Sequence, residues 1–473
     1  MTEAILPSKK GNAKNWGLLA VAAAIIVVAA LMPDVAGLTF GGRMSLALML
    51  SGIVCMIGGA MPLAIISVAM MALQPFFGIC SFNEAFSNSM SSTVFLIMGT
   101  FIFTVALQKT TIPTRVIGVV LQKAQTNTKA VLLGLMGAVF VLSMFVTNNA
   151  ATAMSMPIVL ALIEANHCIK GESNMSKAFM VCMPLAAFYG GMSTLSGCAI
   201  NVMAVGLLEA NFGYTVTYLT WLIIGLPLGI ILVLLTWFIA THVFKLESLS
   251  QEAVDSSLKE YHALHAIEGR EKMVLLIIGL TVVCWIASTW VPIFNTAAVC
   301  LLACFLFFLP GQKIMEFDDA IKGVNWSILL LIMGVNSLAA SMTATGASTW
   351  LVNTLMGGVA GVNPIVVMLI ASAVVCLVHN LVPVGPAVAG ITVIPLLTLA
   401  LSTGVSLTCM TVMLGWWGGV AFVIPLDCVT LIAYAYGYFT FTDFMKVGAI
   451  PTLVTILYSG TVVPLLCSMM GLV

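Results

Sequence analysis

Long apolar stretches, separated by short polar segments, run through the whole chain of 473 residues. A helix needs roughly 20 apolar residues to cross a bilayer. About eleven stretches approach this length, so the pattern predicts an all-α polytopic membrane protein. The stretches lie near residues 16–32, 44–60, 62–78, 92–108, 178–208, 217–242, 273–291, 294–309, 325–345, 407–437 and 447–470.

Two further pairs of apolar segments are shorter. At 1.5 Å per residue, each segment is about 24 Å long or less, which is short for a bilayer. A chain that turns back at membrane depth is tolerated only where it is buried in protein or lines a wet cavity. We therefore predict two re-entrant hairpins: residues 131–163, in which 131–146 and 150–163 meet at Thr147-Asn148-Asn149, and residues 364–402, in which 364–378 and 387–402 meet across residues 379–386.

Similar segments recur in the same order in the two halves of the chain. The sequence VFLIMG that ends at Gly99 resembles LLLIMG that ends at Gly334, and a Gly-Gly pair follows in each half. Between these segments, each hairpin holds an asparagine, Asn148 or Asn380. Each half is predicted to hold five spans, and because five is odd, the second half is inserted upside down. Inverted repeats with broken helices are an architecture of secondary transporters.

The basic residues predict the orientation. With a cytoplasmic N-terminus, every one of the 17 Lys and Arg residues except Arg43 falls on the cytoplasmic side, as the positive-inside rule requires. We therefore predict an integral protein of the cell membrane (inner or plasma membrane) whose C-terminus lies outside. The predicted parts are a tail and first span at 1–43, a first repeat at 44–244 with a broken helix at 178–208, a cytoplasmic linker at 245–272, and a second repeat at 273–473 with a broken helix at 407–437.

The composition agrees with the pattern. Charged residues make up 7% of the chain and hydrophobic residues 61%, whereas a soluble domain has about 25% charged residues. A soluble protein is excluded, and a formal net charge of zero gives no indication of a nucleic-acid partner. The 12 cysteines are scattered through apolar runs, so we expect neither a transition-metal site nor a cofactor.

Polar residues inside the apolar stretches are the candidate functional groups. A run of small and hydroxyl residues extends from Ser193 to Asn201, and Pro425 interrupts the corresponding helix of the second half. Freed carbonyls, hydroxyls and amides are ligands that suit Na⁺, while helix N-termini suit an anion. Packing between helices is the alternative for Ser193, Thr194 and Ser196 taken singly.

His379 and Asp427 are the strongly ionisable side chains predicted inside the membrane. Such groups are functional hypotheses by default. The alternatives are a packing role for His379 and, for Asp427, acceptance of bonds from helix N-terminal amides. No Lys or Arg is predicted beside them, so a bound anion would need amide dipoles and co-bound cations.

Two other classes of membrane protein, a hydrolase and a channel, fit the sequence less well. An intramembrane hydrolase could use Ser193 with His379, but a serine near glycines is weak evidence in a Gly-rich membrane protein. A channel is disfavoured because the sequence has no ring of charged residues and no filter-like run.

Three segments resemble a known family. The hairpin sequence FVTNNAATAMSMP, ending at Pro157, is similar to the Ser-Asn-Thr hairpin of the divalent anion/sodium symporter family. The run GGMSTLSGCAIN, ending at Asn201, resembles that family's Gly-Gly-x-x-Thr-Leu-x-Gly-Thr-Pro-Pro-Asn run, and AYGYFTFTDFMKVG, ending at Gly448, resembles its segment before the last helix.

The resemblance implies a homodimer that carries di- or tricarboxylates or sulfate with Na⁺, by movement of a transport domain along a scaffold. It also implies that the first hairpin contacts substrate and the first sodium, and that the run from Ser193 completes that sodium site. The implied residues are Thr147, Asn148 and Asn149 in the hairpin and Ser193, Thr194, Gly197, Cys198 and Asn201 in the run.

The second half departs from the family pattern. Its Ser-Asn-Thr tip is not kept: His379-Asn380-Leu381 is one alignment, and Gly385-Pro386-Ala387 is another. Asp427 stands where the family has a small neutral residue, which leaves open that a proton replaces one sodium. We name His379, Asn380, Pro386 and Asp427 as candidate substrate contacts, and Asn380 and Asp427 also as candidate cation ligands.

The sequence therefore predicts a secondary active transporter, not an enzyme. We expect cation-coupled symport of a small anion, and a di- or tricarboxylate is the first candidate. Na⁺ is the expected coupling ion, and H⁺ is a second candidate. Symport of sulfate or another divalent anion and anion exchange are the alternatives.

Overall fold

The structure is a computed structural model that describes residues 9–472 except 34, 312–313, 356–361 and 383. The regular structure of these residues is helical, apart from an isolated bridge between Val35 and Leu38. The predicted all-α fold is therefore confirmed.

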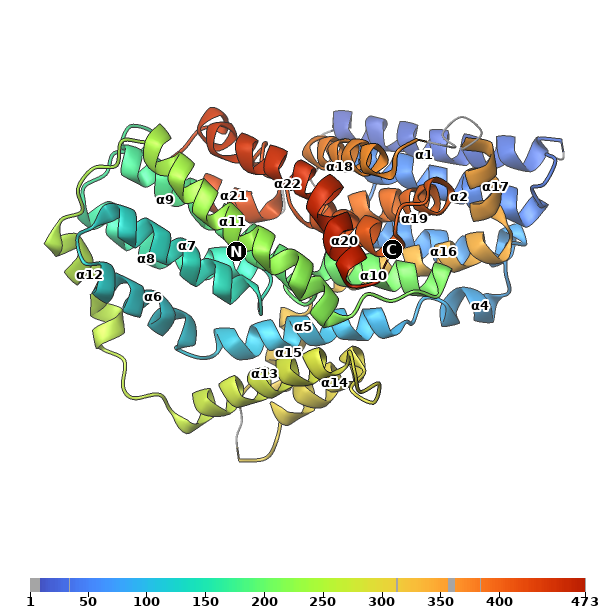
Figure 1. The fold of residues 1–473 in the computed structure, drawn as a ribbon. Helices are drawn as coiled ribbons and strands as arrows, with labels where there is room; N and C mark the ends of the chain where they lie inside the picture. Colours follow the sequence, from blue (N-terminus) through green and yellow to red (C-terminus); the bar gives the residue numbers. More distant parts are fainter. Residues whose placement is uncertain (1–8, 34, 312–313, 356–361, 383, 473) are drawn as a thin grey trace.

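The helices of the first half differ in length, from the 3 residues of η1 to the 26 residues of α11 (Figure 1). Their bounds are α1 Lys9–Leu31, α2 Phe40–Gly58, α3 Leu63–Leu73, η1 Pro75–Phe77, α4 Phe82–Ser87, α5 Ser92–Gln108, α6 Ile112–Ala124, α7 Thr128–Ser143, α8 Asn148–Ala165, α9 Asn174–Ser193, α10 Ala199–Phe212, α11 Tyr218–Val243 and α12 Gln251–His262.

The second half follows the same order of elements. Its helices are α13 Gly269–Ala287, α14 Thr296–Leu306, α15 Phe317–Gly323, α16 Trp326–Ala344, α17 Ala347–Leu355, α18 Pro364–Leu381, α19 Gly385–Thr403, α20 Leu407–Gly419, α21 Cys428–Tyr434 and α22 Phe441–Met469. In each half a helix pair (α7/α8, α18/α19) is followed by an interrupted helix (α9/α10, α20/α21) and a long helix (α11, α22). The division into repeats stays a prediction.

Among the residues that the structure describes, seven helical segments are long and apolar enough to cross a membrane by length and composition. Helices α18 and α19 are among them, with 18 and 19 residues, so they are longer than the sequence pattern suggested. Their length is therefore no argument for a re-entrant hairpin. The turn between α18 and α19 does reach a cavity, as a re-entrant hairpin would.

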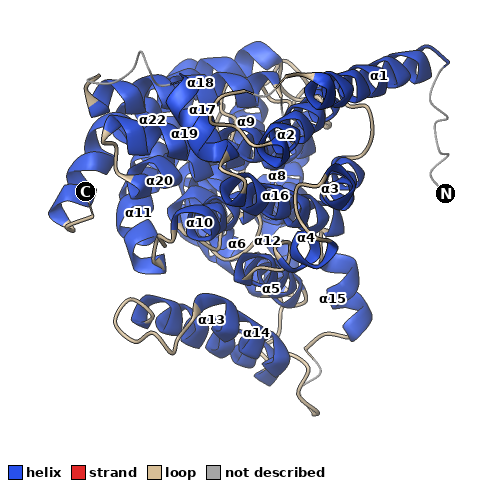
Figure 2. Cartoon of the chain, turned by 90° about the vertical axis from the view of Figure 1, so that its right-hand side faces the viewer, coloured by secondary structure: helices blue, strands red, loops and turns tan. Residues whose placement is uncertain are grey.

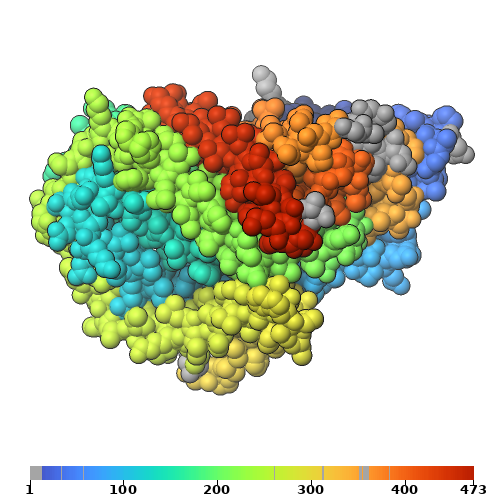
Figure 3. All heavy atoms as spheres, in the orientation of Figure 1, coloured from blue at the N-terminus to red at the C-terminus, as the bar shows by residue number. Residues whose placement is uncertain are grey.

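The helices form two groups that meet along α5, α10 and α16. Helices α7 to α11 pack with α18 to α22, and α22 crosses the surface between α11 and α18 (Figure 3). The other group contains α1 to α5 and α13 to α17, in which α13 and α14 lie beside α5 (Figure 2). We call these the hairpin group and the outer group.

Glu271 joins α6 to the start of α13. Its Oε1 accepts hydrogen bonds of 2.6 Å from both the amide and the hydroxyl of Thr111, and its Oε2 lies 3.8 Å from the Arg115 guanidinium. Burial raises the pKa of Glu271, but the bonds from Thr111 and the charge of Arg115 outweigh it, so the net shift is downward. The carboxylate therefore connects the starts of α6 and α13 on the predicted cytoplasmic side.

Candidate functional site

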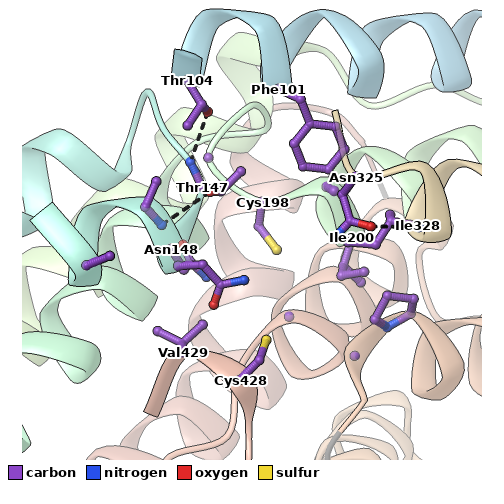
Figure 4. Close-up of a pocket in the computed structure, with 18 of the residues that line it drawn as sticks. Phe101, Thr104, Thr147, Asn148, Cys198, Ile200, Asn325, Ile328, Cys428 and Val429 are labelled. Carbon is purple, nitrogen blue, oxygen red and sulfur yellow. Dashed lines mark hydrogen bonds between the residues drawn. The ribbon is translucent and has the colours of Figure 1, made fainter. Parts of the chain in front are cut away.

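A cavity of about 430 Å³ lies between the two groups of helices (Figure 4). Both helix-pair turns and both helix interruptions reach it, together with α5 and the start of α16. Thr147 and Asn148 lie on one side of the cavity and Asn325 on the opposite side. The predicted site residues that line it are Thr147, Asn148, Asn149, Gly197, Cys198, Pro386 and Asp427.

The turn between α7 and α8, which we call the first tip (residues 144–147), is held by its own polar groups. Thr147 is the N-cap of α8, and its Oγ1 accepts from the amide of Ala150 at 3.4 Å. The amide of Thr147 donates to Thr104 Oγ1 of α5 at 3.4 Å. Asn148 is buried and its Oδ1 accepts from Ser143 Oγ at 2.9 Å, whereas Asn149 is exposed.

The interruption between α9 and α10, which we call the first break (residues 194–198), lies against the first tip. Thr194 Oγ1 donates to the carbonyl of Met144 at 2.8 Å and accepts from the amide of Gly197 at 3.0 Å. Asn201 Nδ2 donates to the carbonyls of Gly191 and Thr194 at 2.8 and 2.9 Å. Asn201 Oδ1 is buried with no hydrogen-bond partner among the described residues.

Two glycines allow this close approach. A β-carbon at position 191 would overlap the Asn148 carboxamide, and one at position 197 would lie 2.8 Å from Thr194 Oγ1 and 2.9 Å from the carbonyl oxygen of Ser143. The first tip and the first break are thus packed directly against each other.

Ser193 does not reach the cavity. Its hydroxyl donates to the carbonyl of Tyr189 at 2.8 Å, within α9. A β-carbon at Gly229 of α11 would overlap Ser193 Oγ, so the side chain lies in the contact between two helices. Ser193 therefore has the packing role that was the alternative for it, and it is not among the predicted site residues that line the cavity. His379 bonds elsewhere, so the two residues do not form a nucleophile and base.

The turn between α18 and α19, which we call the second turn, differs from the first tip. Helix α19 begins at Gly385 with Val384 as its N-cap, as α8 begins at Asn148 with Thr147 as its N-cap. The structural counterpart of Asn148 is therefore Gly385, which lines the cavity with Pro386. Of the two alignments that the sequence left open, the start of α19 agrees with the one through Gly385-Pro386-Ala387, whereas Asn380 lies in the last turn of α18.

Asn380 is used to hold the second interruption in place. We call this interruption, between α20 and α21, the second break (residues 420–427). Asn380 Nδ2 donates to the carbonyl of Cys376 at 2.8 Å, and its Oδ1 accepts from the amide of Ile424 at 3.0 Å. The carboxamide thus has partners on both sides and does not line the cavity.

His379 and Asp427 are brought together, although they are distant in sequence. The His379 ring is fully buried and its Nε2 lies 3.6 Å from Asp427 Oδ2. His379 Nδ1 lies 2.6 Å from the carbonyl of Trp417; because a carbonyl only accepts, Nδ1 carries a proton. Asp427 Oδ1 accepts from the amide of Val429 at 2.8 Å and so caps α21, as the structural alternative for this residue anticipated.

The electrostatics of the cavity are defined by amides and one carboxylate. No lysine or arginine is among the described residues that line it. Sequence reasoning missed the wall contributed by the outer group, which is Phe101, Thr104, Gln108 and Asn325. No motif marks these residues, although Thr100 and Thr104 do share one face of α5.

Helix pairs and broken helices that meet around a cavity are the architecture of a secondary transporter. The chain belongs to the family described as "Sodium:sulfate symporter transmembrane region", whose model matches residues 12–472.

Similar proteins agree with this assignment. The chain is 28% identical over 337 residues to proteins named "Sodium-dependent dicarboxylate transporter SdcS" from Staphylococcus saprophyticus and Staphylococcus aureus. The alignment covers 66% of this chain and 64% of each relative, so about a third of the relatives' length is unmatched. In fold, the chain resembles the YdaH transporter of Alcanivorax borkumensis, with a TM-score of 0.55, 13% identity, and coverage of 92% of this chain and 99% of that one.

Proposed function

We propose that the chain is a secondary transporter that moves a dicarboxylate across the cell membrane together with Na⁺. The observation that carries the proposal is the convergence of both turns and both breaks on one cavity without lysine or arginine. The substrate class and the coupling ion are those for which the relatives, sodium-dependent dicarboxylate transporters, are named.

The residues of the cavity suit an anion that is held without a fixed cation. Helices α8, α10 and α19 begin at the cavity wall, and free amides at a helix N-terminus favour a negative charge. Side-chain amides of Asn149 and Gln108 add donors. A sodium ion at the first tip and first break would offset the remaining charge, so anion and sodium binding would favour each other.

Movement of the hairpin group relative to the outer group would give alternating access. The outer wall of the cavity includes Gln108, next to Lys109, and Asn325, close to Lys322. Both positions are cytoplasmic by the positive-inside rule, so the cavity would open toward the cytoplasm, with the N-terminus inside and the C-terminus outside. We also propose that the chain functions as a homodimer, as the family resemblance implies.

Sulfate symport is the second candidate function, since the family description names sulfate. A cavity of about 430 Å³ admits either anion. Anion exchange with the same site remains a third mode.

Uptake into proteoliposomes tests the proposal. An inward sodium gradient should drive accumulation of radioactive succinate, and the same gradient of potassium should not. Parallel assays with sulfate and citrate define the substrate class. Uptake that is equal with both cations would overturn sodium coupling, and saturable counterflow without any cation gradient dependence would indicate exchange.

Gly191→Ala should weaken sodium binding. The added methyl group must displace the Asn148 carboxamide, and overpacking of this kind costs about 1–3 kcal/mol. We expect the sodium concentration that half-saturates uptake to rise by about tenfold. Gly137→Ala, in the same hairpin, is the matched control, because nothing lies within 4 Å of its added β-carbon. Equal sodium dependence in the two variants would contradict the assignment of the tip.

A further inference from the structure

The outer group contributes polar side chains to the cavity whose hydrogen-bond donors are not all used. Three such side chains line it: Thr104, Gln108 and Asn325. Thr104 Oγ1 donates to the carbonyl of Thr100 at 3.0 Å and accepts from the amide of Thr147 at 3.4 Å. The Gln108 carboxamide, in contrast, has no hydrogen-bond partner among the residues that the structure describes.

Asn325 is held so that its amino group is the unused one. It is the N-cap of α16, and its Oδ1 accepts from the amide of Ile328 at 3.2 Å. Because a carboxamide has one oxygen and one NH₂ group, this cap leaves Nδ2 as the remaining donor. Asn325 is exposed at the cavity wall, and within the described part of the chain Nδ2 has no partner.

These donors lie across the cavity from the first tip. Thr147 is on one side and Asn325 on the opposite side, and Phe101, Cys198 and Ile200 lie between them (Figure 4). The cavity therefore has polar groups at two sides and a largely apolar wall between them. A molecule with a carboxylate at each end of a short hydrocarbon chain matches this order, whereas sulfate has no apolar part.

We propose that a dicarboxylate bridges the two groups of helices, with one carboxylate at the first tip and the other accepting hydrogen bonds from Asn325 Nδ2 and the Gln108 amide. Hydrogen bonds from N–H groups to an ionised carboxylate are stronger than those to a neutral acceptor, which suits a wall without lysine or arginine. The inference rests on the proposed function, and it adds the residues of the outer group that select a dicarboxylate.

The bridging contact depends on how the two groups are arranged. Asn325 and Gln108 belong to the outer group, whereas the first tip belongs to the hairpin group. Movement of one group relative to the other separates the two sides of the cavity. The second carboxylate is therefore held by these amides on one face of the membrane and released from them on the other.

Asn325→Ser tests this one-sided contact. Serine keeps the cap of α16 but lacks the NH₂ group. Sodium-driven succinate uptake is measured in right-side-out and in everted membrane vesicles, and in everted vesicles the cytoplasmic face is outside. We expect the half-saturating succinate concentration to rise by about tenfold in everted vesicles and to stay unchanged in the others. Asn295→Ser is the matched control, because Asn295 Oδ1 caps α14 in the same way and Asn295 does not line the cavity.

The outcomes separate this inference from the proposed function. An increase confined to right-side-out vesicles supports the contact and places the opening of the cavity on the outer face. No increase, equal increases in both kinds of vesicle, or the same change in Asn295→Ser would overturn the inference alone. Absence of sodium-driven succinate uptake by the unmodified protein would overturn both. If Asn325→Ser does not fold, Gln108→Met, at the exposed last residue of α5, replaces it.

Competition by monomethyl succinate identifies the group that Asn325 binds. This compound keeps one carboxylate and the hydrocarbon chain, and at about pH 8 succinate has both carboxyl groups ionised. The ratio of the two inhibitory concentrations should fall by about tenfold in Asn325→Ser, because succinate loses a contact that the ester never makes. A ratio equal to that of the unmodified protein would show that Asn325 does not bind the second carboxylate.

Discussion

Asn148→Ala is expected to lower sodium-driven succinate uptake by between about tenfold and a hundredfold. The Asn148 carboxamide lies between Ser143 Oγ and Gly191 on the buried side and the cavity on the other. A hydrogen bond or ligand contact to a charged group contributes about 1.5–3 kcal/mol, which corresponds to this range of affinity. The measurement is the initial rate of uptake into proteoliposomes at sodium and succinate concentrations below half-saturation.

Two further variants make the result specific. Asn211→Ala is the control, because Asn211 bonds to the carbonyl of Leu207 and the hydroxyl of Thr343, away from the cavity. Asn148→Asp keeps an oxygen for sodium but adds a negative charge near the anion, so sodium should still stabilise the variant against heat while uptake is lost. If Asn148→Ala transports at the rate of Asn211→Ala, the first tip is not part of the binding site.

The first half of the candidate site could be predicted from sequence because its polar residues lie in two short segments. Two features mark the site in the sequence: a polar tripeptide between two apolar runs, and a Gly-Gly pair before a hydroxyl-rich run. Polar groups at membrane depth must be buried in protein or line a wet cavity. The structure brings Thr147, Asn148 and Asn149 to the cavity with Gly197 and Cys198. Local pattern and tertiary position coincide here.

The second half was predicted less well because its polar residues do not lie at the turn itself. The pairing of Asn148 with Asn380 followed from residue type, yet the start of α19 makes Gly385 the counterpart. The role of His379 depends on Trp417 and Asp427, which reach it from another helix and another break. Such contacts between distant segments leave no periodic signal in the sequence.

The outer wall of the cavity illustrates the same limit. Gln108 ends α5 and Asn325 precedes α16, and each resembles any polar residue at the end of a membrane helix. Asn325 Oδ1 indeed caps α16 by accepting from the amide of Ile328 at 3.2 Å. Only the packing of α5, α16 and the first tip around one space gives these residues a place in the site.

His379→Leu is expected to cost the folded protein about 1–3 kcal/mol, the range for leaving a buried hydrogen-bond partner unsatisfied. Leucine fills a similar space but leaves the carbonyl of Trp417 without a donor and Asp427 Oδ2 facing an apolar group. Thermal and denaturant unfolding of the purified protein in detergent measures the loss, and Asp443→Asn, at a buried cap of α22, serves as the control carboxylate.

A double-mutant cycle tests whether the loss of stability comes from the contact between His379 and Asp427. Asp427→Asn keeps the cap on α21, since asparagine accepts at an N-cap as well as aspartate does. In the His379→Leu background it removes the unpaired carboxylate, so part of the stability should return, with a coupling energy of about 0.5–3 kcal/mol. Additive losses would mean that His379 and Asp427 contribute independently to the stability of the protein. Recovery would show that the contact between His379 and Asp427 stabilises the second break.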